Sequence, residues 1–291
     1  MPTMHLNGAR FVYDEAGRSD AEAFVAIHGG RGIGDRFGEY DAWLPLADQY
    51  RVMAYDQRGC GESSLTPPYN FEQFADDLEA IRLDHFGGRR IILQGGSFGG
   101  MIALTYAVKY PLGASRLILR GTAASHHNED DAFETFKARI HKAPSASVAM
   151  LRKVFSDTVV DDTELRLIWL ALQPLYFERF DPDAALERVR NMRFHAETHN
   201  ALFKERSYDL RDRLADIAVP TLVIVGAKDW ICPPNHSRLI AEAIPGAELF
   251  EVEGANHAVH FEANAAVIVR TREFLSRTGP VGAAAATDSR S

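Results

Sequence analysis

The chain has little cysteine and no long apolar run. Its 291 residues include only Cys60 and Cys232, which lie far apart in the sequence, so no disulfide framework is expected. No apolar run approaches the roughly 18 residues that a membrane-spanning helix requires. The N-terminus lacks a charged stretch followed by an apolar one, so no secretory signal is expected. These absences predict a soluble, cytoplasmic protein.

The chain also lacks an excess of positive charge. It has 32 Lys and Arg against 40 Asp and Glu, with a pI near 5.8, and the two signs are interspersed. Such a surface does not suit nucleic acid. His126 and His127 are adjacent and have no further ligand pattern such as C-x-x-C or H-E-x-x-H, so no metal site is predicted. No cofactor is expected, and the predicted partner is a small molecule or a short peptide. The oligomeric state stays open.

Short apolar runs alternate with helix-like segments in two parts of the chain. A hairpin is predicted at residues 4–14, where the sequence turns at Asn7-Gly8. Strands are expected at 23–27, 51–56, 90–95, 116–119, 220–226 and 248–252, and helices at 71–86, 98–110, 235–244 and 261–276. This alternation predicts an α/β fold with a mostly parallel sheet and helices on both faces.

The composition and hydrophobic pattern of the chain change after Gly121. Residues 122–215 hold no convincing strand, are charged and helix-like, and carry interleaved aromatic side chains. We therefore predict an α/β core of residues 1–121 and 216–278, with residues 122–215 as an inserted helical cap over the strand ends. Residues 279–291 are rich in Gly and Ala and are expected to form a disordered tail.

The most informative motif is Gly95-Gly96-Ser97-Phe98-Gly99. It follows the apolar run 91–93 and precedes the helix-like run 101–107. G-x-S-x-G between a strand and a helix is typical of a nucleophile elbow, a turn so tight that the neighbours of the serine need to be small. Ser97 is therefore the predicted nucleophile.

A serine hydroxyl needs a base, and the base needs an orienting acid. In proteins with a G-x-S-x-G nucleophile elbow, the triad residues follow one another along the chain in the order Ser, then Asp or Glu, then His. Asp229 follows the strand at 220–226, and His257 follows the strand at 248–252. Active sites of parallel sheets are built at these carboxyl ends. We predict the triad Ser97-Asp229-His257, with His260 as the main alternative base and His236 as another competitor.

An oxyanion hole needs two backbone donors. The N–H of Phe98, directly after the nucleophile, is one candidate. The loop His28-Gly29-Gly30-Arg31 after the strand at 23–27 matches the HGG type. The second donor is expected at Gly30, where a glycine lets substrate approach the backbone.

With these motifs the chain resembles the α/β-hydrolase superfamily over essentially its full length, and most closely the proline iminopeptidase group of serine aminopeptidases. Residues 28–32 are similar to the HGGPG of that group, residues 55–63 match its D-Q-R-G-x-G-x-S run, and residues 95–100 resemble its GGSWG. Two positions depart from the group, since Arg31 replaces Pro and Phe98 replaces Trp. Asp56 and Arg58 of the D-Q-R-G run are expected to pair and hold the oxyanion loop.

The resemblance also implies acidic residues, at least one of them from the cap, that bind the free α-ammonium of the substrate. The nearest match is Glu197, although the cap is rich in glutamate and such a residue is more often solvated on a helix than an amine anchor. Trp230 stands directly after the predicted triad Asp and is expected to form the pocket wall. Trp169, Tyr176 and Phe177 either line an apolar pocket or form the core of the cap.

The sequence therefore predicts a cofactor-independent serine hydrolase that works through an acyl-enzyme. The favoured substrate is a small peptide or amide with a free N-terminus, as for a proline iminopeptidase. The alternative is an esterase, lactonase or amidase that acts on small acyl compounds. A haloalkane dehalogenase or epoxide hydrolase is disfavoured, because those enzymes need Asp at the elbow. A different class, a non-catalytic receptor on a hydrolase scaffold, would not need all three triad residues.

Overall fold

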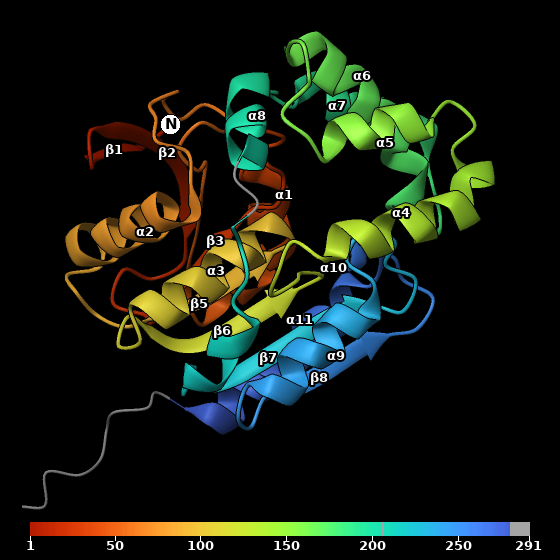
Figure 1. Ribbon diagram of the computed structural model, residues 1–291. Coiled ribbons are helices and arrows are strands. Elements are labelled where there is room, and N and C mark those ends of the chain that lie inside the picture. The colour runs from red at the N-terminus through yellow and green to blue at the C-terminus, as the bar shows by residue number, and fades with distance from the viewer. Residues whose placement is uncertain (205–206, 280–291) are drawn as a thin grey trace, which may run out of the picture.

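One eight-stranded sheet runs through the centre of the molecule (Figure 1). The computed structural model describes residues 1–204 and 207–279. The strand order is β1-β2-β4-β3-β5-β6-β7-β8. The strands are β1 (Thr3–Leu6), β2 (Ala9–Ala16), β3 (Ala23–Ile27), β4 (Arg51–Tyr55), β5 (Ile91–Gly96), β6 (Ala114–Arg120), β7 (Thr221–Gly226) and β8 (Glu248–Val252). β2 pairs antiparallel with both β1 and β4, and the strands from β3 to β8 run parallel, so the predicted mostly parallel sheet is confirmed.

The central strands are buried along their whole length. Every residue of β3, β5, β6 and β7 is buried, whereas the edge strand β8 is partly exposed. A parallel strand with helices on both faces needs apolar side chains in both directions, which explains runs such as residues 23–27. Because β3 to β8 run parallel, the loops that follow these strands meet at one edge of the sheet.

Helices cover both faces of the sheet. One face carries α2 (Phe71–His85), α3 (Phe98–Lys109) and α9 (Pro234–Ala243), and the other carries α1 (Phe37–Trp43) and α11 (Asn264–Thr278). The helix that was expected at 261–276 is in fact two helices, α10 (Val259–Glu262) and α11. They are separated at Ala263, whose backbone (φ −131°, ψ 35°) is not helical. The prediction of one continuous helix is therefore wrong at this point.

The described residues between β6 and β7 form five α-helices, three short 3-10 helices and no strand. The α-helices are α4 (Asn128–Arg139), α5 (Val148–Val154), α6 (Asp162–Leu172), α7 (Pro182–Asn191) and α8 (Ala196–Lys204). Figure 1 shows α4 to α7 grouped together, with α8 standing apart from them. Ser147, Asp161 and Asp181 each accept a backbone N–H at the start of α5, α6 and α7, as N-caps do.

The cap has its own apolar clusters, but the chain returns to the core before residue 215. Phe136, Leu151 and Leu172 belong to a cluster of cap residues. Tyr208 and Leu214 instead pack with the core side chains of α2 and α3. Of the tail predicted at 279–291, residues 280–291 lie outside the described residues. No helix in the described ranges is both long enough and apolar enough to cross a bilayer.

Candidate active site

Ser97 occupies a strained turn between β5 and α3. Its backbone angles are φ 53° and ψ −120°, which a residue with a side chain rarely adopts. Gly99 permits this turn, since a Cβ there would lie 2.3 Å from the carbonyl oxygen of Ile27. The Ser97 N–H donates to the carbonyl of Arg120 at 2.8 Å, and the Thr122 hydroxyl donates to the carbonyl of Ser97 at 2.7 Å. The chain thus holds Ser97 in the strained geometry that the G-x-S-x-G motif predicts.

His257 and Asp229 form a buried pair at the same edge of the sheet. His257 Nδ1 lies 2.7 Å from Asp229 Oδ2, and the side chains are 8% and 0% exposed. Asp229 Oδ1 accepts the N–H groups of Ile231 (3.1 Å) and Cys232 (2.9 Å), so the carboxylate is held from both sides. Because a carboxylate can only accept, Nδ1 is the donor in this contact, and Nε2 is the ring nitrogen that is not used by Asp229. This arrangement fits a base oriented by an acid.

Gly121, at the end of β6, contacts this pair closely. A Cβ on Gly121 would lie 2.9 Å from Asp229 Oδ2 and 3.3 Å from His257 Nδ1, and the backbone φ is 49°. Only glycine suits this position. Sequence reasoning did not assign Gly121 to the site, although its place directly after a parallel strand was a usable signal.

The alternative histidines have other surroundings. His260 is buried on α10, with Nε2 3.9 Å from Glu39 Oε1, and burial together with Arg120 and His257 lowers its pKa well below the usual value. His236 contacts Asp131 of the cap at 2.8 Å. Of these candidates, His257 is the one that faces Asp229.

The loop after β3 packs directly on Ser97. A Cβ on Gly29 would lie 2.9 Å from the Cβ of Ser97 and 3.6 Å from its Oγ. At the start of the loop, Gln57 Nε2 donates to the carbonyl of His28 at 2.6 Å. Gly30 and Phe98 both line the cavity that Ser97 and His257 line. Their N–H groups therefore stay the predicted oxyanion donors.

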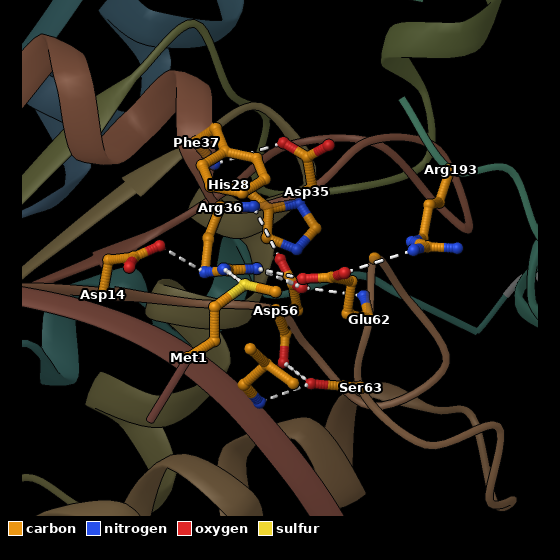
Figure 2. A network of polar contacts seen from close by, with 12 residues as sticks. Met1, Asp14, His28, Asp35, Arg36, Phe37, Asp56, Glu62, Ser63 and Arg193 are labelled. Carbon is orange, nitrogen blue, oxygen red and sulfur yellow. Dashed lines mark hydrogen bonds and ion pairs between the residues drawn. The ribbon is translucent and has the colours of Figure 1, made fainter. Parts of the chain in front are cut away.

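Asp56 holds the far end of this loop through Arg36, as Figure 2 shows. The Asp56 carboxylate accepts Arg36 N at 2.7 Å, Arg36 Nη1 at 2.8 Å and Glu62 N at 2.8 Å. Arg58 instead makes a buried ion pair with Asp77 of α2 at 2.7 Å. The expected Asp56–Arg58 pair is therefore wrong. Arg36 and Asp77 give each of these buried charges a separate partner of opposite sign, which a buried charge requires.

The cap is hydrogen-bonded to the same loop. Gly34 N donates to the carbonyl of Arg193 at 3.1 Å, and His195 N donates to that of Gly32 at 2.8 Å. His199 Nδ1 lies 3.0 Å from the carbonyl of Arg31, which can only accept, so Nδ1 is the donor. Burial lowers the pKa of His199 to about 4. The loop thus lies between the D-Q-R-G segment and the cap.

A cavity of about 740 Å³ lies between the cap and the strand ends. Ser97 and His257 line it together with Trp169, Tyr176 and Phe177, so these cap aromatics face the cavity as well as the cap interior. Arg31 also lines it. The guanidinium lies 4.2 Å from the centre of the Phe203 ring and 3.6 Å from the carboxylate of Glu129.

Two of the predicted substrate residues lie elsewhere. Trp230 is fully buried in the cap cluster, and Tyr176 lies between it and His257, with ring centres 5.3 Å from Trp230 and 5.5 Å from His257. Glu197 is exposed on α8 and is not among the described residues that line the cavity. Trp230 is therefore a second layer behind Tyr176 and not the expected pocket wall, and Glu197 lies outside the cavity lining.

Sequence reasoning missed Asn128, a buried residue at the start of α4 that lines the cavity. No motif marks it. Across residues 1–204 and 207–279, no group of three or more His, Cys, Asp or Glu side chains is placed to hold a metal ion.

The chain matches known hydrolases along most of its length. Residues 22–264 match the sequence model of the α/β hydrolase fold. Proline iminopeptidase PfmaB of Pestalotiopsis fici is 45% identical over 94% of this chain and 99% of its own length. A proline iminopeptidase of Lactobacillus helveticus is 28% identical over 89% of this chain and 92% of its own.

Solved structures agree with this relationship. A hydrolase from Pseudomonas aeruginosa has a TM-score of 0.72 at 28% identity and covers 94% of this chain and 97% of its own. The enol-lactonase from Burkholderia xenovorans has a TM-score of 0.71 at 25% identity and covers 94% of this chain and 100% of its own. The chain therefore belongs to the α/β-hydrolase fold family, and it is a serine hydrolase that resembles the proline iminopeptidases.

Proposed function

We propose that Ser97, His257 and Asp229 form a catalytic triad that works through an acyl-enzyme. The observation that carries the proposal is that the strained Ser97 lines the same cavity as His257, whose ring is paired with the buried Asp229. Ser97 Oγ attacks the substrate carbonyl while His257 Nε2 takes its proton. Asp229 keeps the imidazole in the required tautomer and stabilises the cation that forms.

The remaining steps use the loop over Ser97. The N–H groups of Gly30 and Phe98 hold the oxyanion of the tetrahedral intermediate. His257 then donates its proton to the leaving group, and a water molecule that His257 deprotonates releases the acyl group from Ser97.

The substrate that we propose is a small peptide or amide with a free N-terminus, cleaved as by an aminopeptidase. The 45% identity to a proline iminopeptidase over nearly the whole chain supports this choice. The cavity of about 740 Å³ is within the range of small-ligand pockets and lies beneath the cap. A long folded polypeptide would not fit such a site.

A second candidate is an esterase, lactonase or amidase of small acyl compounds. The position of Glu197 favours it, because this carboxylate is exposed outside the cavity and does not offer a countercharge to a bound ammonium. The likeness to an enol-lactonase at 25% identity also supports it. The same three residues would carry out either reaction.

Two assays test these proposals. A fluorophosphonate probe should label the wild type and the control Ser276→Ala, whose serine is exposed on α11, but not Ser97→Ala. Labelling that persists in Ser97→Ala would refute the triad. Turnover is then compared for prolyl and alanyl p-nitroanilides, their N-blocked analogues, p-nitrophenyl butyrate and a simple lactone. Cleavage of free-amine anilides alone supports the aminopeptidase, and cleavage of the ester or lactone alone supports the second candidate.

A further inference from the structure

Asn128 is a buried amide in the wall of the cavity. It is the first residue of α4, is 3% exposed, and lines the same cavity as Ser97 and His257. Its Nδ2 donates to the carbonyl of Ile231 at 3.2 Å and lies 3.7 Å from Cys232 Sγ. The side chain is thus held on one side by the loop that follows β7.

These contacts fix which way the amide points. The carbonyl of Ile231 can only accept a hydrogen bond, so the NH₂ group, not the oxygen, has to face it. Oδ1 is therefore on the other branch of the amide, and it is buried with no donor among the described residues. A buried acceptor without a donor is destabilising, so a group that supplies one N–H or O–H gains from binding there.

Other cavity-lining side chains also have buried polar atoms without a partner in the described parts of the chain. Arg120 Nε and Trp169 Nε1 are donors, and the role of His260 Nδ1 depends on the tautomer. His199 Nε2 is an acceptor, because Nδ1 of this neutral ring donates to the carbonyl of Arg31. Asn128 Oδ1 and His199 Nε2 are therefore the acceptors among these described atoms, and only the amide oxygen keeps that role at every pH, because an amide does not titrate. The cavity wall therefore contains one fixed site for a donor from the ligand.

The Asn128 side chain contacts the segment that also holds Asp229. Ile231 and Cys232, which contact the Asn128 amide, are the residues whose N–H groups hold the Asp229 carboxylate. Cys232 itself lines the cavity. A substrate at Ser97 therefore shares its cavity with the Asn128 amide. This amide contacts Ile231, and Ile231 in turn donates its N–H to Asp229, the predicted orienting acid of the triad.

We propose that Asn128 Oδ1 accepts a hydrogen bond from an N–H or O–H on the acyl part of the substrate, and so determines its specificity. The inference rests on the proposed triad and names the substrate class more narrowly. It selects acyl groups with a donor near the scissile carbonyl, such as the ring nitrogen of a prolyl group or an α-amino group, over carbocyclic analogues. Asn128 Oδ1 is a neutral acceptor for such a donor, and Glu197 lies outside the cavity lining.

The test compares two substrates that differ in one group, the p-nitrophenyl esters of proline and of cyclopentanecarboxylic acid. The rings have the same size, and the N–H of one is a CH₂ in the other. Wild type should prefer the prolyl ester by at least roughly 10-fold in kcat/KM. Asn128→Leu, which keeps the volume and removes the acceptor, should lower kcat/KM for the prolyl ester by about 10- to 100-fold and change the carbocyclic ester by less than about 3-fold.

Asn191→Leu is the matched control, because Asn191 lines the same cavity from α7 but is exposed and bonds Glu187 through Nδ2. It should keep the wild-type preference. Equal losses on both esters in Asn128→Leu, or no loss on either, would overturn the proposal. If Asn128→Leu does not fold, equal wild-type rates on the two esters would overturn it by themselves. Ester turnover that survives in Ser97→Ala would instead refute the triad, so the two failures are distinguishable.

Discussion

His199 gives the protein a dependence of stability on pH whose size follows from the structure. The imidazole is 1% exposed on α8, and its Nδ1 donates to the carbonyl of Arg31 at 3.0 Å. Burial lowers its pKa from 6.5 to about 4. The folded protein therefore keeps this ring neutral at a pH where the unfolded chain has already bound a proton.

The sign follows from proton linkage. Between pH 6.5 and about 4 the unfolded state holds more protons at this residue, so acid favours unfolding. The stabilising contribution is complete above pH 6.5 and is lost as the pH falls to about 4. The two pKa values differ by about 2.5, which corresponds to about 3 kcal/mol in total and to about 2 kcal/mol by pH 5.

The variant His199→Asn isolates the contribution of His199 to the pH dependence of the unfolding free energy. The amide can still donate to the carbonyl of Arg31, but it does not titrate, so the loss of unfolding free energy between pH 8 and pH 5 should be about 2 kcal/mol smaller than in wild type. Urea unfolding followed by circular dichroism at both pH values measures it. His260 is still present in the variant, and burial lowers its pKa too, so part of the dependence remains.

The control is His141→Asn, which removes an exposed imidazole from the cap and should retain the wild-type dependence. If His199→Asn lost as much stability between pH 8 and pH 5 as the wild type does, the reasoning from burial would be refuted.

Three other substitutions test the architecture of the site. Asp56→Asn leaves the buried Arg36 guanidinium without its fully buried carboxylate and should cost about 3 kcal/mol in urea unfolding; a loss below about 1 kcal/mol would contradict the buried pair. Gly121→Ala places a Cβ 2.9 Å from Asp229 Oδ2 and should lower kcat by at least about 100-fold on p-nitrophenyl butyrate, and a near-normal kcat would show that the His257–Asp229 pair does not need this glycine. Trp230→Phe should lower the unfolding free energy by about 1–2 kcal/mol and leave KM unchanged, because Tyr176 separates Trp230 from the cavity; a KM raised several-fold would return Trp230 to the pocket wall.

The arrangement of the loop after β3 links the cap to the predicted oxyanion hole. Backbone hydrogen bonds join Gly32 to His195 and Gly34 to Arg193 of the cap. Gln57 bonds the start of the loop at His28, and Asp56 bonds its end at Arg36. A change in the position of the cap would therefore move the loop that packs on Ser97. Substitutions in the cap segment are expected to act on kcat as well as on substrate binding.

The local pattern of the sequence determined the fold and the places where chemistry could occur. Short, mostly apolar runs such as 23–27 and 221–226 fit strands buried on both faces, and parallel strands bring their carboxyl ends to one edge. The predicted sheet is confirmed for this reason. Ser97, Asp229 and His257 stand within five residues of the ends of parallel strands, so topology brings them to one edge of the sheet, while their roles stay predictions.

Only the tertiary structure decided which side chains meet across loops and from the cap. Asp56 forms an ion pair with Arg36, and Arg58 forms one with Asp77, although Asp56 and Arg58 are only two positions apart in the sequence. In α8 the buried face holds His199 and Phe203, which puts Glu197 on the exposed face. Spacing along a chain sets the backbone and the face of each helix. The identity of a buried partner depends on which distant segment packs against that face, and no local pattern contains this information.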